Sequence, residues 1–379
     1  MRLVLDEEHQ LLRQTAADLV RSKSSLKRIR ALRDGADTSG FSRDLWHEMA
    51  SLGWAGIVVP EAHGGAGLGY SHLMVVMEEL GRGLLPEPMI PTVLGCAALL
   101  IGGSEEQRRA LLPAICKGET LIALGYQEPA SRFDPRHVET RAERDGGGRT
   151  LRGEKRMVLA GQSADTLIVS TRTSGGPSER AGITLFCVDP KQRGVTVTRQ
   201  SLLDSRPAAI VRLEGVHVEG SAVIGEVDEG GGILEGAIDR ATAALSAEML
   251  GSMLAAFEMT VDYLKARKQF GVPIGTFQAL KHRAAIVYTE TELSRSVVMA
   301  ACFALDDGAS DAAQRISAAK ARLSDAFVLA ANEAVQMHGG IGMTDEHDIG
   351  FYLKRSRAAE MTFGDAGWHR RRYAELSGY

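Results

Sequence analysis

A group of residues near the end of a predicted helix has the chemistry to hold an anion and a flat ring. Arg267 offers a planar fork of donors suited to a phosphate, Gln269 adds a neutral donor and acceptor, and Phe270 adds a flat apolar surface. Gly271 and Pro273 follow, and we expect them to end the helix. The group therefore points to a nucleotide-like cofactor. On residue types alone, a solvated helix end with a basic last turn is the alternative.

Two glycines after a later predicted helix could contact the same kind of ligand. Gly339 and Gly340 follow a helix expected over 312–338. One glycine can adopt a left-handed cap, and the other can let a ligand approach the backbone closely. Gln336 lies one turn earlier. A helix cap without a ligand is the alternative interpretation.

Three segments resemble signatures of the acyl-CoA dehydrogenase family, flavoenzymes that remove two hydrogens across the α and β carbons of an acyl thioester. The segments run from Tyr263 to His282, from Val59 to Gly69 and from Gln336 to His347. They occur in the family's order across almost the whole chain, so together they are far more specific than one glycine-rich match. The resemblance implies an α+β fold with an N-terminal α-helical domain, a middle β-barrel domain and a C-terminal four-helix bundle.

The resemblance also implies FAD as the cofactor. In the family, the residues at the matching motif positions hold the adenine and pyrophosphate part of an FAD that is bound mainly by a neighbouring subunit. The residues expected to bind the cofactor are Arg267, Gln269, Phe270, Gln336, Gly339 and Gly340. The implied partners are an acyl-CoA substrate, a homologous or identical subunit, and an electron-transfer flavoprotein.

The segments that would hold the flavin ring depart from the family pattern. The family has Thr-Glu-Pro-x-Ala-Gly-Ser-Asp where this chain has Gln-Glu-Pro-Ala-Ser-Arg-Phe-Asp over 127–134, so only Glu128, Pro129 and Asp134 clearly match. The family's Lys-x-Trp-Ile-Thr-Asn-Gly is replaced by Lys-Arg-Met-Val-Leu-Ala-Gly over 155–161. Leu159 then offers no side-chain hydrogen bond where the family uses Thr. Met157 could still pack on a flavin face, so the motifs leave open whether this chain binds the flavin ring.

The family's reaction needs a carboxylate to remove the α proton, and neither usual position carries one. Counting from Gln336 without a gap puts the Glu of most members at Phe363, before Gly364. Some members use an earlier helix, and counting back from Arg267 puts that Glu at Ala241. The sequence therefore leaves the catalytic base unknown.

Two nearby acids remain candidates for the base. Glu248 lies seven residues after Ala241 on the same helix face, which places it roughly 10 Å further along. We expect Glu248 to pair with an arginine of a packed helix or subunit, because an unpaired acid in such apolar surroundings would be costly. Asp365 lies two residues after Phe363, and we expect it to cap a final helix.

Helix signals at both ends of the chain enclose a β-rich middle. Early helices are indicated by a capping box from Ser104 to Gln107 and by a helix that Ser71 precedes and Gly81 ends. Short β-rich runs are expected over 121–126, 166–170, 183–188, 195–198 and 209–213, with a hairpin turn over 145–148. A glycine-rich linker is expected over 225–232. Later helices are expected over 233–267, 277–306, 312–338, 345–361 and 365–376. These patterns predict domains over 1–119, 120–228 and 229–379.

Composition excludes several other classes of protein. The chain has 379 residues, 44% of them hydrophobic, and a formal net charge of -4, which argues against nucleic acid as a partner. No apolar run of the length needed to span a membrane and no signal peptide is found, so we expect a cytoplasmic protein. Its four widely spaced cysteines are expected to be reduced, and its histidines are too scattered for a metal site.

The leading hypothesis is a FAD-dependent acyl-CoA dehydrogenase that acts as one subunit of a heteromeric complex. In some bacterial members of the family, one chain supplies the flavin pocket and base while another supplies the adenine-side motifs. This chain carries the second set. The alternatives are a self-sufficient homotetramer with a non-standard base, and a non-catalytic structural homologue.

Overall fold

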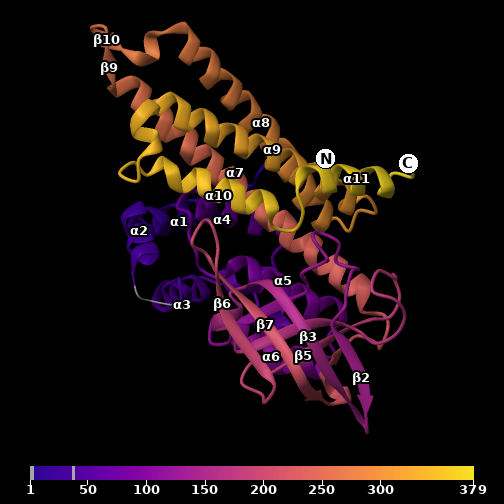
Figure 1. Cartoon of the computed structure of the whole chain (residues 1–379). Coiled ribbons are helices and arrows are strands. Elements are labelled where there is room, and N and C mark those ends of the chain that lie inside the picture. The colour runs from indigo at the N-terminus through magenta and orange to yellow at the C-terminus, as the bar shows by residue number, and fades with distance from the viewer. Residues whose placement is uncertain (1–3, 36–38) are drawn as a thin grey trace. The chain divides into compact units, whose positions relative to one another are not determined.

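Along the sequence, helices come first, strands follow, and helices come last (Figure 1). This order confirms the predicted α+β class. The computed structural model describes residues 4–35 and 39–379. Two compact units are formed. Unit 1 contains residues 4–35, 69–85 and 242–379, and unit 2 contains residues 39–68 and 86–241.

Unit 2 is built around one eight-stranded sheet. Its strands are β1 (Ile122–Gly125), β2 (Arg141–Asp145), β3 (Gly148–Leu159), β4 (Thr166–Arg172), β5 (Ile183–Val188), β6 (Val195–Ser201), β7 (Pro207–Val218) and β8 (Val223–Ile224). They are ordered β6-β7-β3-β2-β4-β5-β8, and β1 pairs in parallel with β4. Helices α3 (Arg43–Ser51), α5 (Met89–Gly102) and α6 (Glu105–Cys116) belong to the same unit.

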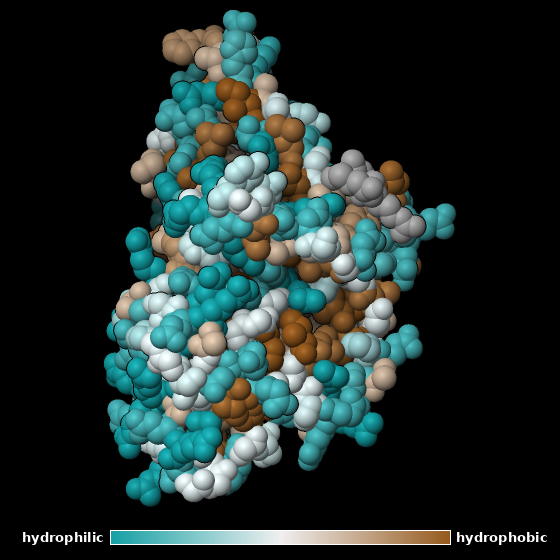
Figure 2. Space-filling model, turned by 90° about the vertical axis from the view of Figure 1, so that its right-hand side faces the viewer, coloured by the Kyte–Doolittle hydropathy of each residue, from teal (hydrophilic) through white to brown (hydrophobic). Residues whose placement is uncertain are grey.

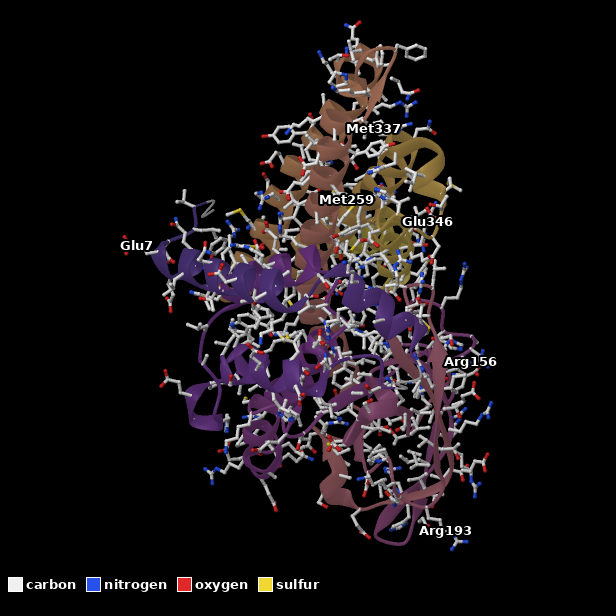
Figure 3. The ribbon with its side chains drawn as sticks, turned by 90° about the vertical axis from the view of Figure 1, so that its left-hand side faces the viewer. Glu7, Arg156, Arg193, Met259, Met337 and Glu346 are labelled. Atoms are coloured by element: carbon white, nitrogen blue, oxygen red, sulfur yellow. The ribbon has the colours of Figure 1, made fainter. Side chains whose placement is uncertain are left out.

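The expected hairpin joins β2 and β3, where Asp145 pairs with Gly148 and Gly146 has a φ of 59°. All five predicted β-rich runs lie on strands, but β2, β3 and β8 were not predicted as strands. β3 is hard to predict because its exposed charged residues hide the alternation, and a register shift between Lys155 and Val158 breaks it. Arg156, for example, points outward from this strand (Figure 3).

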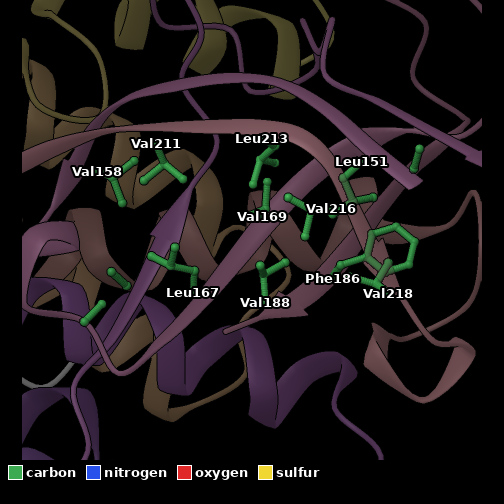
Figure 4. Packing of buried hydrophobic residues seen from close by; sticks show 13 residues of the cluster. Leu151, Val158, Leu167, Val169, Phe186, Val188, Val211, Leu213, Val216 and Val218 are labelled. Carbon is green, nitrogen blue, oxygen red and sulfur yellow. The ribbon is translucent and has the colours of Figure 1, made fainter. Parts of the chain in front are cut away.

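The core of unit 2 is a cluster of aliphatic side chains and one phenylalanine, closely packed against the strands (Figure 4). Beside it lies a buried ion pair, in which the Lys155 ammonium is 2.5 Å from a carboxylate oxygen of Glu128. The same carboxylate accepts backbone hydrogen bonds from Glu139 and Thr140. The ammonium and the two amides together provide the Glu128 carboxylate with hydrogen bonds. Both charges of the pair can therefore be buried. Glu128 thereby links the segment over 127–134 to the sheet.

Unit 1 consists mainly of helices. They are α1 (Glu7–Lys23), α2 (Leu26–Asp34), α4 (Tyr70–Arg82), most of α7 (Gly230–Ala266), α8 (Gln278–Asp306), α9 (Ala312–His338), α10 (Ile349–Met361) and α11 (Ala366–Leu376). The later helices match the predicted ranges closely. By length and composition α7 could cross a membrane, but 67% of its most apolar window is buried inside the protein, as in a core helix. All four cysteines are free, as expected.

Some predicted boundaries are wrong, among them the start of α10, which lies at Ile349 rather than at 345. Gly230 already begins α7, so the expected linker over 225–232 is shorter than predicted. Ser71 lies inside α4 rather than before it, because Asp306 of α8 accepts hydrogen bonds from the amides of Tyr70 and Ser71, at 2.5 and 2.9 Å. A distant carboxylate thus caps α4, which local sequence could not show.

Helices α4 and α7 cross at very short range in unit 1. A Cβ atom on Gly81 would lie 2.1 Å from the Glu248 carbonyl oxygen, and one on Gly251 would lie 1.7 Å from the Glu78 carbonyl oxygen. The two backbones therefore touch, and the Ser252 hydroxyl donates to the Gly81 carbonyl at 2.8 Å. Only glycine fits at both crossing positions.

Replacing Gly251 with Ala should lower the free energy of unfolding by about 1–3 kcal/mol or more, because the added methyl would force α4 and α7 apart. Gly232→Ala is the matched control in the same helix, since no atom lies within 4 Å of a Cβ there. That variant should be neutral or more stable by up to about 1 kcal/mol. Urea unfolding measures both, and equal stabilities would contradict the close contact.

Candidate functional site

The predicted phosphate-binding group lies on an arm at the end of α7. The helix ends at Ala266, and β9 (Lys268–Gln269) and β10 (Val272–Pro273) then form a short hairpin whose tip is Phe270 and Gly271 (Figure 1). Both tip residues have positive φ angles, 53° and 81°. Gly271 and Pro273 were expected to end the helix. They instead shape the turn and second strand of the hairpin.

The side chains of the arm are held out from unit 1. Phe270 is 93% exposed, and its nearest aromatic neighbour is Phe277, edge-on at 6.1 Å. Arg267 is also exposed, and none of the ion pairs between described residues includes it. Hydrophobic residues on the face shown in Figure 2 lie in small groups between hydrophilic ones. A fully exposed phenylalanine in a left-handed backbone conformation is unusual, and it offers a surface ready to bind a ring.

The second predicted segment is equally open. Gln336 and both glycines are exposed, and neither Gly339 nor Gly340 has any atom within 4 Å of a Cβ position. Gly339 has a φ of 67° and a ψ of -146°. The predicted left-handed cap is therefore wrong in detail, although this conformation also favours glycine. The 3-10 helix η6 (Gly339–Met343) follows α9 directly. Met337 and Glu346, which are labelled in Figure 3, precede and follow η6 in the chain.

A cluster of three rings joins the two segments. The ring of Tyr263 on α7 lies 4.5 Å from that of His338 on α9, which lies 4.4 Å from that of His347. His338 Nδ1 donates to the Ala334 carbonyl at 2.7 Å. Burial lowers the pKa of His338, and His347 lowers it further, so the imidazole is neutral near pH 7. The six predicted cofactor residues thus lie around one end of the helical unit.

The usual position of the catalytic Glu lies in a strained and tightly held turn. Phe363 is 4% exposed with a φ of 61°, and Gly364 has a φ of 112°. His369 Nε2 donates to the Phe363 carbonyl at 3.1 Å. The Lys320 ammonium donates to the carbonyls of Gly364 at 2.7 Å and Glu360 at 3.0 Å. These hydrogen bonds hold the backbone of the turn in place, but the side chain of Phe363 cannot accept a proton.

Both candidate acids have structural partners. Glu248 is buried, and one of its carboxylate oxygens lies 2.8 Å from both Nε and Nη2 of Arg355, which confirms the expected arginine partner. Asp365 caps α11 by accepting a hydrogen bond from the Trp368 amide at 2.7 Å. Ala241, at the other usual base position, is completely buried. Whether either acid takes part in catalysis stays a prediction.

The segments that depart from the family's flavin-ring motifs have unusual backbone angles at two of the substituted positions. Arg132 stands at the family's glycine, and its φ of 47° keeps a glycine-like backbone. Met157 has a φ of 53°, and its amide donates to the Gln200 side chain at 3.0 Å. Leu159 is half-buried. Arg132 and Met157 therefore adopt positive φ angles that glycine adopts most readily, while their side chains differ from those of the family motifs.

Family models for acyl-CoA dehydrogenases match the chain in three successive parts: the N-terminal domain at 6–119, the middle domain at 123–215 and the C-terminal domain at 228–377. The acyl-CoA dehydrogenase IpdE2 of Mycobacterium tuberculosis is 31% identical over 356 residues, covering 93% of this chain and 92% of that protein. The chain belongs to the acyl-CoA dehydrogenase family. Its members are FAD-dependent oxidoreductases of acyl-CoA metabolism. The domain boundaries predicted from the sequence, 1–119, 120–228 and 229–379, remain our proposal, because the matched ranges do not test them.

Other relatives within the family differ in what their names say they act on. The 3-(aryl)acrylate reductase of Clostridium sporogenes is 30% identical over 353 residues, covering 90% of this chain and 91% of that protein. A solved variant of the Tcur3481-Tcur3483 steroid ACAD is 32% identical with a TM-score of 0.87 and covers 98% of both chains. Butyryl-CoA dehydrogenase of Megasphaera elsdenii is 25% identical with a TM-score of 0.91 and covers 100% of both chains.

Sequence reasoning missed Lys320, which holds the turn at the usual base position. The lysine is completely buried and also donates to the Ser324 hydroxyl at 3.0 Å. A signal was present, because Lys320 falls between Ile316 and Leu323 on the apolar stripe of α9. No group of three potential metal-binding side chains occurs among the described residues.

Replacing Lys320 with Met should flatten the pH dependence of stability. Burial lowers the pKa of Lys320 from 10.5 to about 7, so the unfolded chain binds this proton more tightly. The stability of the unchanged protein should therefore fall as pH drops from 10.5 towards 7, by up to about 1.4 kcal/mol per pH unit from this group. Urea unfolding across this range measures the slope.

The exposed residue Lys117 supplies a matched control, and Lys117→Met should keep the slope of the unchanged protein. The same slope in Lys320→Met would show that Lys320 has an ordinary pKa.

Proposed function

We propose that this chain is the adenine-side subunit of a heteromeric acyl-CoA dehydrogenase. The observation that carries the proposal is the contrast between two half-sites. Arg267, Phe270 and the Gly339–Gly340 backbone are open and exposed. The usual base position is a buried phenylalanine. A chain of this kind can complete the FAD site of a neighbour without carrying out the chemistry alone.

The exposed residues fit the adenine and pyrophosphate part of FAD. The exposed guanidinium of Arg267 can bind the pyrophosphate, and the ring of Phe270 can stack on the face of a heterocycle. At Gly339 and Gly340 the absence of any Cβ leaves space for a ligand against the backbone. FAD supplies the hydride acceptor for the β hydrogen. In this proposal, the chain's own residues bind and orient the cofactor.

The flavin-ring half fits less well in this chain. Arg132 adds a long charged side chain where the family has none, and Leu159 lacks the hydroxyl that the family uses. The partner subunit would therefore supply the flavin pocket and the carboxylate that removes the α proton. An acyl-CoA is the substrate, and an electron-transfer flavoprotein is the proposed electron acceptor. The Tcur3481-Tcur3483 steroid ACAD, 32% identical to this chain, joins two named components, which agrees with such an arrangement.

A self-sufficient enzyme is the alternative, with Glu248 or Asp365 as the base. Their partners argue against it, because Glu248 is paired with Arg355 inside the helical unit and Asp365 is occupied as the cap of α11. A non-catalytic homologue is a third reading, and it predicts no turnover with any partner. Four free cysteines agree with the proposed cytoplasmic location.

The chain purified alone should carry little or no flavin, whereas co-expression with a homologue encoded beside it should give a yellow complex. Visible spectra before and after adding a panel of acyl-CoA thioesters measure binding and reduction together. Bleaching of the complex by one thioester supports the proposal. A chain that binds FAD alone and is bleached would contradict it, and Glu248→Ala and Asp365→Ala would then identify the base.

In the complex, Arg267→Ala should reduce bound FAD about tenfold or more, because a charge-assisted contact to the pyrophosphate is lost. Lys265→Ala removes an exposed cation from the last turn of α7 and is the matched control. It should leave FAD content unchanged. Flavin absorbance per protein measures both variants, and equal losses would mean that only general positive charge matters.

A further inference from the structure

Two arginines of α2 contact the segment that follows the exposed glycines. Arg30 donates to Asp345 and to Asp348, each at 2.9 Å. Arg33 binds both carboxylate oxygens of Asp345, at 2.6 and 2.9 Å. Its remaining hydrogen-bonding capacity is directed to Asp34, at 2.6 and 2.9 Å. Both guanidiniums therefore have defined orientations.

The same two arginines stack against one buried aromatic ring. Their guanidinium carbons lie 5.0 and 5.3 Å from the ring centroid of Phe351, which is 8% exposed. Isolated surface ion pairs contribute little, but bidentate geometry, shared carboxylates and a cation–π contact make a stronger network. The Arg33 guanidinium lowers the pKa of Asp345 to about 2, so this carboxylate stays charged at any physiological pH. We call Arg30, Arg33, Asp345, Asp348 and Phe351 the α2 clamp.

The α2 clamp lies next to the proposed cofactor backbone. Asp345 is two residues after Met343, the last residue of η6, and the ring cluster around His338 holds the other end of the segment. Between these ends, Gly339 and Gly340 are exposed, and a Cβ at either position would have no atom within 4 Å. The conformation that they present to a ligand therefore depends on how firmly both ends are held.

We propose that Arg30 and Arg33 are positioning residues of the cofactor half-site: they hold the 339–348 segment in its binding conformation and make FAD binding sensitive to ionic strength. This inference rests on the proposed function. Salt sensitivity follows because the Debye length falls from about 10 Å at 0.1 M salt to about 3 Å at 1 M. The clamp is open to such screening at Asp345, whose side chain is 63% exposed.

Hydrogen exchange of the chain alone tests the clamp without any cofactor. Amides in the segment make hydrogen bonds that can report on it, such as that from Thr344 to the Ile341 carbonyl at 3.0 Å. In Arg30→Ala/Arg33→Ala, exchange over 339–348 should be about three- to tenfold faster, with α9 unchanged. Asp345→Asn should give a smaller increase. It also provides a second test if the double variant does not fold.

Arg21→Ala is the matched control for exchange, because Arg21 is an exposed arginine paired only to Asp18 of its own helix among the ion pairs described. Its exchange pattern over 339–348 should equal that of the unchanged chain. Unchanged exchange in both clamp variants would overturn the inference.

FAD titration of the apo complex tests the functional consequence. At about 0.05 M salt, Arg33→Ala should weaken FAD binding about three- to tenfold, and the difference from the unchanged complex should shrink at about 0.5 M. Arg33→Lys should fall between the two, because it keeps the charge but loses the planar fork. Loss of the Arg33 contacts should lower the urea midpoint more than loss of Arg21, so FAD binding is compared without urea, where both variants are folded.

The outcomes separate the two proposals. If the unchanged complex does not bind FAD, the proposed function fails, while hydrogen exchange still measures the clamp. If it binds FAD and all variants bind equally at both salt concentrations, the positioning role is wrong.

Discussion

The backbone contact between α4 and α7 is the constraint on which the helical unit depends. At this crossing the Glu248 carbonyl lies against Gly81, while the Glu248 side chain reaches Arg355 of α10. The Tyr352 hydroxyl, also on α10, donates to the Arg82 carbonyl at the end of α4. Three helices are thus held through one small region. From it, α7 leads to the arm, and α10 leads to the turn at Phe363.

That turn separates the shape of a catalytic loop from its chemistry. Its carbonyls receive hydrogen bonds from Lys320 and His369, which lie on α9 and α11, so its path does not depend on the side chain at 363. A phenylalanine can therefore stand there despite a positive φ, which costs roughly 1–2 kcal/mol. Arg132 repeats the pattern in the sheet unit, where a glycine-like backbone carries a large side chain. The family's framework is retained at both places while the reactive or permissive residue is gone.

The groups that remain open are concentrated at the other end of the helical unit. Phe270 exposes an aromatic ring, and Arg267 exposes a charge that no described carboxylate pairs with, although burial or pairing would be more favourable for each within a single chain. Both features become favourable when a ligand or neighbouring subunit covers them. The proposed role as one half of a shared site accounts for this exposure, and the proposed role of the α2 clamp is to hold the 339–348 segment of that site.

The sequence by itself determined the family, the α+β order and most helix boundaries, because caps, turns and apolar periodicity act over a few residues. The helices predicted over 277–306 and 312–338 agree with α8 and α9 almost to the residue. The cofactor role of the motif residues stays a prediction. Tertiary structure alone decided that Asp306 caps α4, that Lys320 holds the Phe363 turn, and that Arg33 binds Asp345. These partners lie 44 to 312 residues apart in the chain. No local pattern encodes such contacts, since they arise only when packing brings distant helices together.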